Sequence, residues 1–198
     1  MAGSGIMEGI MEHRRMNIPL EISTSRLLLR RWIRSDREPF AALNADPQVM
    51  KFFLTALTRE ESDAFIDRIE AHFERNHFGL WAVEIPKVAS FIGFVGLSVP
   101  KFEAHFTPCV EIGWRLASPF WNKGYATEGA KAVLNFGFQK VGLKEIVSFT
   151  TVKNDPSRRV MEKIGMTHDS SGDFDHPSIL PGHPFRRHVL YRIKPESS

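Results

Sequence analysis

The chain has 198 residues and a formal net charge of +3, from 26 basic and 23 acidic side chains. This length suits one domain with a buried core, and so small a charge does not predict a nucleic-acid surface. A single cysteine, Cys109, excludes an internal disulfide framework and a cysteine-based zinc site, and it fits a reducing cytoplasm. No apolar run approaches the ~20 residues that span a bilayer, so we do not expect a membrane protein.

Residues 1–19 contain four methionines and little hydrophobic pattern, and they lack the apolar centre of a signal peptide. We interpret them as a flexible N-terminal extension. One domain is then expected to cover residues 20–195.

The first half of this domain is predicted to contain a strand, two helices and three further strands. Two S/T-x-x-E capping boxes, at Ser35–Glu38 and Thr58–Glu61, each predict the start of a helix. In the second helix Phe65, Ile69 and Phe73 recur every four residues and form one apolar face. The predicted strands cover residues 25–32, 80–85, 90–99 and 110–117, and the last three have the pattern of an antiparallel meander.

The second half alternates helices and strands. A helix with one apolar stripe begins at Ala126 and ends near Gly142, and a strand at residues 145–152 follows. The segment Asn154-Asp155-Pro156 predicts the next helix start. A long loop rich in proline and histidine then leads to a strand at residues 187–193. Because the unit at 110–152 is strand–helix–strand, its two strands should be parallel, which predicts an α+β fold with a mixed sheet.

The segment FWNKGYATEG, residues 120–129, joins a predicted strand to a predicted helix with little side-chain bulk. The unpaired N–H groups of such a loop and of the first helical turn converge on one place, and the helix dipole favours an anion there. Gly124 lets a ligand approach the backbone, and Lys123 adds a positive charge. A pyrophosphate site is therefore one interpretation, and a simple tight turn with a glycine is the other.

Asn154 and Ser157 lie at the end of the next predicted parallel strand and in the first turn of the following helix. Ligands of open sheets bind at the carboxyl ends of parallel strands, so both side chains should face a cleft beside the Gly124 loop. The alternative is that Asn154 only caps its helix, and the two roles are compatible.

Three stretches together resemble the GCN5-related N-acetyltransferase (GNAT) family, namely VEIGWRLASPFWNKGYATEGAKAVLNFGF, KNDPSRRVMEKIGM and the segment from FDHP to RRHVLY. The chain most resembles the branch of the ribosomal-protein N-terminal acetyltransferases, from about Leu20 to Tyr191. The resemblance implies a mixed, mostly antiparallel sheet with a splayed parallel central strand pair and flanking helices. It also implies acetyl-coenzyme A as the acetyl donor and no metal.

The resemblance further implies where coenzyme A binds. The pantetheine arm would pair with the backbone near Trp114 to Leu116, the pyrophosphate would sit on N–H groups of residues 122–127, and Asn154 would hold the pantetheine amide. The implied cofactor-binding residues are Trp114, Leu116, Trp121, Asn122, Lys123, Gly124, Tyr125, Ala126, Thr127, Asn154 and Ser157.

Two positions depart from the wider family's pattern. Trp121 stands where many members have arginine or glutamine in the loop, so the site depends more on backbone N–H groups and on Lys123. Met161 stands where many members have a tyrosine general acid. A tyrosine mechanism is therefore not expected.

Direct attack of an amine on the thioester, with both substrates bound, needs a base and donors for the oxygen and the sulfur. Glu111 is the candidate base, because it lies on the strand that forms one wall of the cleft; a partly exposed strand glutamate is the alternative. Ser157 is the candidate donor to the leaving sulfur, and an N–H near Leu116 is the candidate oxyanion donor. Cys109 is expected to be inert.

The function predicted is acetyl transfer from acetyl-coenzyme A to a primary amine, at a protein N-terminus or on a small molecule. A catalytically weak coenzyme A-binding sensor or scaffold is the alternative, and Met161 favours it. The spacing of His176, His183 and His188 matches no standard metal site, so we interpret them as contacts that shape the acceptor side. One of them acting as the base is the alternative to Glu111. Tyr191 is expected in the cleft or in the core, and the pair Arg30-Arg31 in solvent. A monomer or a homodimer is expected.

Overall fold

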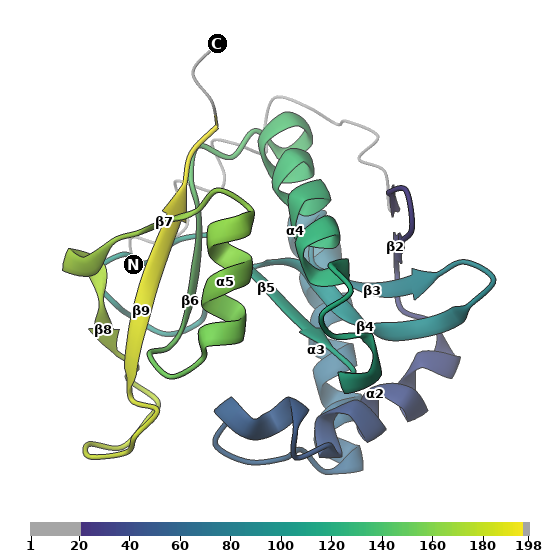
Figure 1. The fold of residues 1–198 in the computed structure, drawn as a ribbon, viewed down its shortest axis with the longest axis horizontal. Coiled ribbons are helices and arrows are strands. Elements are labelled where there is room, and N and C mark those ends of the chain that lie inside the picture. Colours follow the sequence, from purple (N-terminus) through teal and green to yellow (C-terminus); the bar gives the residue numbers. More distant parts are fainter. Residues whose placement is uncertain (1–20, 196–198) are drawn as a thin grey trace.

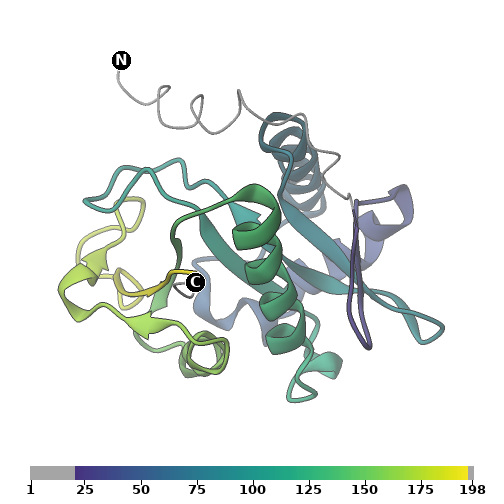
Figure 2. The same cartoon turned by 90° about the horizontal axis from the view of Figure 1, so that it is seen from above.

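The computed structural model describes residues 21–195, so the predicted extension at 1–19 and the predicted boundary at residue 20 lie outside the described residues. The described chain forms one mixed sheet with helices on both faces (Figures 1 and 2). The strand order is β1-β2-β3-β4-β5-β6-β9-β7, and β8 pairs with β9 beside this path. The α+β class with a mixed sheet is confirmed.

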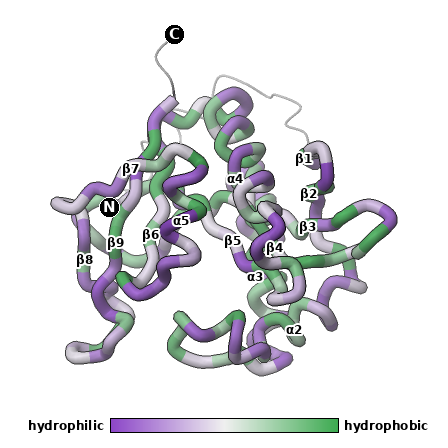
Figure 3. Tube along the Cα trace, in the orientation of Figure 1, coloured by the Kyte–Doolittle hydropathy of each residue, from purple (hydrophilic) through white to green (hydrophobic). Residues whose placement is uncertain are grey.

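The first arm of the sheet is antiparallel throughout, as the meander pattern predicted. Hydrophobic residues dominate its central strands, whereas the helices alternate between hydrophilic and hydrophobic residues (Figure 3). This difference follows from the period of each element, since strands β3 and β4 are covered on both faces and helices on one only. The strands are β1 Ile22–Ser23, β2 Leu28–Arg30, β3 Leu80–Ile85, β4 Ala89–Ser98 and β5 Glu111–Leu116.

The second arm consists of β6 Ile146–Thr151, β7 Thr167–His168, β8 Phe174–Asp175 and β9 Arg187–Ile193, and β9 pairs antiparallel with β6, β7 and β8. The short strand β8 lies in the predicted long loop, residues 173–185, and β7 lies just before it. Sequence patterns indicated neither strand, because two residues are too few to show a period. The arms join through β5 and β6, which are parallel and share a single register pair, Glu111 with Val147.

In the described part of the chain, four α-helices cover the sheet, α2 and α3 on one face and α4 and α5 on the other (Figures 1 and 2). They are α2 Arg37–Ala45, α3 Arg59–Asn76, α4 Tyr125–Phe136 and α5 Asp155–Lys163. α4 continues through one π turn at Gly137–Val141 and ends at Gly142, whose φ of 79° is left-handed, as the sequence predicted. The short turns are η1 Arg34–Asp36, η2 Val49–Phe52, η3 Ser118–Phe120 and η5 Ser170–Gly172.

One predicted capping box is confirmed and the other is wrong. The Glu61 N–H donates to Thr58 Oγ1 (3.2 Å) and the Thr58 N–H donates back to Glu61 Oε2 (2.8 Å), which opens α3. Before α2 it is Asp36, not Ser35, whose side chain accepts a backbone N–H, from Ile33 at 2.9 Å. The reason is that a 3₁₀ turn precedes α2 and moves the acceptor position by one residue.

The expectation that Arg30 lies in solvent is also wrong, since its side chain is buried inside the sheet arm. Its guanidinium donates to both carboxylate oxygens of Asp36 (2.8 and 2.9 Å), to Glu84 (2.9 Å) and to the Ser90 carbonyl (2.6 Å). Strand alternation places Arg30 on the inner face of β2, so burial forces it to find acidic partners.

We predict that Asp36→Asn costs about 3–5 kcal/mol of unfolding free energy, because it leaves a buried guanidinium with one acidic partner fewer. Urea unfolding checks this, with Glu74→Gln as the control. Glu74 also pairs with an arginine, Arg31, but is 73% exposed, so its replacement should cost less than about 1 kcal/mol. Equal costs for the two variants would contradict the prediction.

Candidate functional site

The strands β5 and β6 separate directly after their one register pair. The Val147 N–H donates to the Val110 carbonyl (2.9 Å), and Ser148 Oγ donates to the Ile112 carbonyl (2.9 Å). These bonds show that even-numbered residues of β5 turn their main-chain groups away from β4 and toward β6. The main chain of Trp114 therefore faces the gap that opens between the strands.

A cleft of about 460 Å³ occupies this divergence. Residues of β5, β6 and the start of α5 line it, together with the segments that follow η2 and β8. Of the predicted catalytic and cofactor-binding residues, it brings together Glu111, Trp114, Asn154 and Ser157, but not Leu116. Met161, His176 and His188, which the sequence analysis also singled out, line it as well. The loop residues 121–127 are not in its lining; they lie beyond the carboxyl end of β5.

The loop before α4 has the geometry of an anion site. Gly124 is the N-cap with a left-handed φ of 82°, and it supplies no capping side chain. By contrast Thr58 caps α3 and Asn154 caps α5 with side-chain oxygens. Within residues 21–195, the N–H groups of residues 124–127 donate to no acceptor. This free row of donors fits a diphosphate.

Trp121 holds this loop against the strand before it. Its indole Nε1 donates to the Leu116 carbonyl at 2.7 Å, and its side chain is 40% exposed. The residue that replaces the family's arginine or glutamine thus acts as a brace and not as a charge. As a result the Leu116 carbonyl is already paired, and only the N–H of Leu116 remains for a ligand.

Sequence reasoning missed a second contact that holds this loop, made by residues of the segment before β2. The Arg26 guanidinium donates to Glu128 (2.6 Å) and to the Lys123 carbonyl (3.0 Å), and it stacks over the Tyr125 ring at 4.7 Å. Glu128 also accepts from Thr24 Oγ1 at 2.6 Å. The residues lie about a hundred positions apart in the sequence, so no local pattern could reveal this contact.

Asn154 caps α5 and lines the cleft at the same time. Its Oδ1 accepts the Ser157 N–H (3.3 Å) and its Nδ2 donates to Thr150 Oγ1 (2.9 Å). An asparagine amide has two lone pairs and two donors, so one of each remains for a ligand. The same bonds fix the orientation of the Asn154 side chain.

Glu111 is a half-buried glutamate in the wall of the cleft. Burial raises its pKa to about 8, and the hydrogen bond from Ser98 Oγ to Glu111 Oε2, which acts in the opposite direction, is long at 3.4 Å. A carboxyl group with a pKa near the working pH can both accept and release a proton there. A general base near neutral pH requires such a pKa.

The three histidines singled out in the sequence lie in two different places. His176 and His188 line the cleft with ring centroids 5.1 Å apart, and burial lowers the pKa of each. His183 instead packs on Phe185. Among residues 21–195 no cluster of three or more His, Cys, Asp or Glu side chains could hold a metal ion.

Tyr191 lies in the core and not in the cleft lining. It is 2% exposed, its hydroxyl donates to Glu162 (3.2 Å), and Arg158 donates to it (3.4 Å). Arg158 is therefore engaged away from the Gly124 loop. The Cys109 thiol has its pKa raised to about 12 by burial, so it does not form a thiolate at neutral pH.

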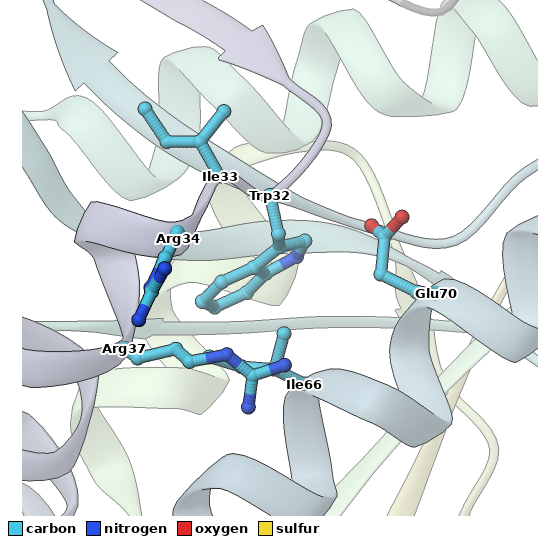
Figure 4. Close-up of a pocket in the computed structure, with 6 residues that line it drawn as sticks. All are labelled: Trp32, Ile33, Arg34, Arg37, Ile66 and Glu70. Atoms are coloured by element: carbon cyan, nitrogen blue, oxygen red, sulfur yellow. The ribbon is translucent and has the colours of Figure 1, made fainter.

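A smaller hollow of about 330 Å³ lies between the segment after β2 and α3 (Figure 4). None of the predicted site residues lines it. Two of its charged side chains are already engaged elsewhere, since Arg37 pairs with Asp67 and Glu70 with Arg31. The larger cleft is therefore the candidate site. Across residues 21–195, the structure contains no helix with the length and apolar character to cross a membrane.

Comparisons with known proteins agree with this geometry. A family model described as an acetyltransferase (GNAT) domain matches residues 26–167. The chain is 32% identical over 148 residues to the uncharacterized N-acetyltransferase YnaD of Bacillus subtilis, a match that covers 74% of this chain and 82% of that one.

Solved structures share the fold. A GNAT-family acetyltransferase from Bacillus anthracis superposes with a TM-score of 0.71 at 28% identity, over 88% of this chain and 98% of the other. The ribosomal L7/L12 alpha-N-protein acetyltransferase RimL, solved with coenzyme A, has a TM-score of 0.70 at 15% identity, over 89% and 97%. The predicted resemblance and the GNAT fold are thereby confirmed.

The raised pKa of Glu111 predicts a pH-dependent stability. The pKa of Glu111 in the folded protein, about 8, exceeds the ordinary value of 4.5, so the folded state binds the proton more tightly than the unfolded state. The stability that this proton contributes is fully present below pH 4.5 and is lost as pH rises toward 8. Glu111→Gln cannot ionise. The unfolding free energy of the variant minus that of the wild type, both measured in urea, should therefore increase by more than about 1 kcal/mol from pH 5 to pH 8.5. Parallel pH profiles would contradict this.

Proposed function

Because the chain belongs to the GNAT family of acetyltransferases, which are acetyl-coenzyme A-dependent acyltransferases, we propose that it transfers the acetyl group to a primary amine. The amine belongs to a protein N-terminus or to a small molecule. The observation that carries the proposal is the free row of N–H groups before α4, next to a strand pair that opens into a cleft. Acetyl-coenzyme A supplies an activated thioester there.

The chain's own groups divide the binding work. The N–H groups of the loop and first turn, from Asn122 to Thr127, hold the diphosphate, with Lys123 as an added positive charge. The free main-chain groups of Trp114 and the amide of Asn154 hold the pantetheine arm between β5 and β6. Trp121, Tyr125 and Ala126 complete the surface, and the bond from Trp121 to Leu116 keeps loop and strand in register.

Glu111 takes the proton that the amine releases, directly or through a water molecule. Its pKa of about 8 suits this task, because a base with a pKa near the working pH accepts a proton and returns it quickly. Ser157 and the N–H of Leu116 supply hydrogen-bond donors for the sulfur and the carbonyl oxygen. Met161, 1% exposed, is in the place of a tyrosine and provides no proton.

The cellular context belongs to the same proposal. The lone cysteine, with its high pKa, fits the reducing cytoplasm, and we propose that location and a monomer or homodimer. The rival function is a coenzyme A-binding sensor or scaffold. It is favoured if the protein binds coenzyme A and acetylates none of a panel of amines and N-terminal peptides in a steady-state assay.

We predict that Gly124→Ala weakens coenzyme A binding at least about tenfold in calorimetry. A methyl group here lies 3.3 Å from Arg26 Nη2, which holds the loop, and at a left-handed φ, so Arg26 is displaced and the backbone is strained. Gly142→Ala is the matched control, because Gly142 has a φ of 79° and open space around it. It should strain the backbone equally and leave coenzyme A affinity unchanged. Loss of affinity in both variants, or in neither, would refute the diphosphate site assigned to residues 122–127.

We predict that Glu111→Gln lowers kcat/KM for the acetylated amine by about 10²–10⁴-fold, the usual contribution of a general base. The wild-type rate should rise with pH up to about 8, since only ionised Glu111 accepts a proton, and the variant should lack this limb. Calorimetry should give the variant the wild-type affinity for coenzyme A. An unchanged pH profile would exclude Glu111 as the base.

A further inference from the structure

Arg115 lines the cleft from the same face of β5 as Glu111, four residues along the strand. Its Nη1 donates to Asn44 Oδ1 of α2 at 2.5 Å. Its guanidinium lies 4.1 Å from the centroid of the Phe53 ring, and the rings of Phe65 and Phe94 are 5.8 and 5.5 Å away. One amide and three phenyl rings thus hold the guanidinium in place.

The positive charge of Arg115 has no acidic partner. Within the described part of the chain no carboxylate lies within ion-pair distance of it, Nη2 donates to no acceptor, and Nε is enclosed without a hydrogen bond. Burial lowers its pKa to about 10. Arg115 is half-buried, whereas the fully buried Arg30 has Asp36 and Glu84 beside it. A largely desolvated charge without a counter-ion is costly, so the position of Arg115 calls for a partner from outside.

The cleft offers no compensating charge at neutral pH. Of the described residues in its lining, four side chains are titratable: Glu111, Arg115, His176 and His188. The pKa of Glu111 is raised to about 8 and those of the two histidines are lowered, so these three are mainly uncharged at pH 7. The lining therefore carries one net positive charge, at Arg115.

We propose that Arg115 binds a carboxylate of the acceptor, so that the enzyme acts on amines that also carry an acidic group. This inference rests on the proposed N-acetyltransferase function and names its substrate class. Arginine suits the task, since its planar fork matches a carboxylate and stacking on phenyl rings keeps the plane fixed. Asn44, which holds Nη1, leaves the Nη2 edge for the carboxylate.

The strand geometry limits where the carboxylate sits. Glu111 and Arg115 are four residues apart, which is about 13 Å between Cα atoms at the usual strand rise. An amine beside Glu111 is therefore well separated from a carboxylate beside Arg115. Asn44 and Phe53 hold the guanidinium without an ion pair to Glu111, so an acceptor whose amine and carboxylate are several bonds apart suits the two residues better than an α-amino acid. A peptide with an acidic residue near its N-terminus, or an extended amino acid such as 6-aminohexanoate, has the required length.

The test compares matched acidic and neutral probes on the full chain saturated with coenzyme A. The peptide pair is Ala-Asp-Ala-amide and Ala-Asn-Ala-amide, and the small-molecule pair is 6-aminohexanoate and 6-aminohexanamide. In calorimetry the wild type should bind the acidic member of at least one pair about ten- to a hundredfold more tightly, as charge-assisted hydrogen bonds do. The pair that shows the preference identifies the source of the carboxylate.

Variants assign the preference to Arg115. In Arg115→Met the acidic and neutral probes should bind alike. Removal of a charge without a counter-ion offsets the loss of its hydrogen bond to the buried Asn44, so the variant should still fold. Arg68→Met is the control: Arg68 also lies near the Phe65 ring, at 5.4 Å, but is exposed on α3. It should keep the full preference.

Two results overturn the proposal. One is equal or undetectable binding of both members of each pair to the wild type; the other is a preference that survives in Arg115→Met. The test measures binding in the presence of coenzyme A and does not depend on acetyl transfer. A failure of the proposed transferase function can therefore be distinguished from a failure of the carboxylate site. An Arg115-dependent preference without turnover would retain the carboxylate site and remove the transferase activity.

Discussion

The parallel pairing of β5 with β6 ends after Glu111 and Val147, and the remaining features of the site depend on this break. Two strands that stayed paired would use up the main chain of Trp114 in hydrogen bonds and leave no space between them. Their divergence instead exposes a strand edge and opens a cleft, which is lined by Asn154, Ser157 and Met161 at one face of the sheet and by Phe65 of α3 at the other.

A strand edge and a row of N–H groups are useful only if they keep their positions without a ligand. Here long-range contacts keep them: Trp121 ties the loop to Leu116, and Arg26 with Glu128 ties it to the chain before β2. Asn154 is fixed by bonds to Ser157 and Thr150. Such preorganisation reduces the ordering cost of binding, which is the reason to place these bonds around a site and not elsewhere on the surface.

Buried charges in this protein serve two purposes, which their surroundings distinguish. Arg30 is surrounded by Asp36, Glu84 and a carbonyl, so its charge is satisfied and it joins β2 to the turn before α2. Glu111 and Arg115 lack such partners and both line the cleft. The fold bears the cost of their desolvation, which is what gives Glu111 its high pKa and leaves Arg115 open to an anion.

Local sequence signals determined the elements that have local causes. The Thr58 capping box, the Asn154 cap, the glycine that ends α4, the bounds of β3 and β9, and the loop at Gly124 all follow from residues close in sequence. Burial and pairing could not be predicted in this way. The charge state of Glu111, the buried ion pairs of Arg30 and the missing partner of Arg115 depend on helices and strands tens of residues away. Only the packed chain sets the dielectric and the neighbours of a charged group, so the tertiary structure alone decided them.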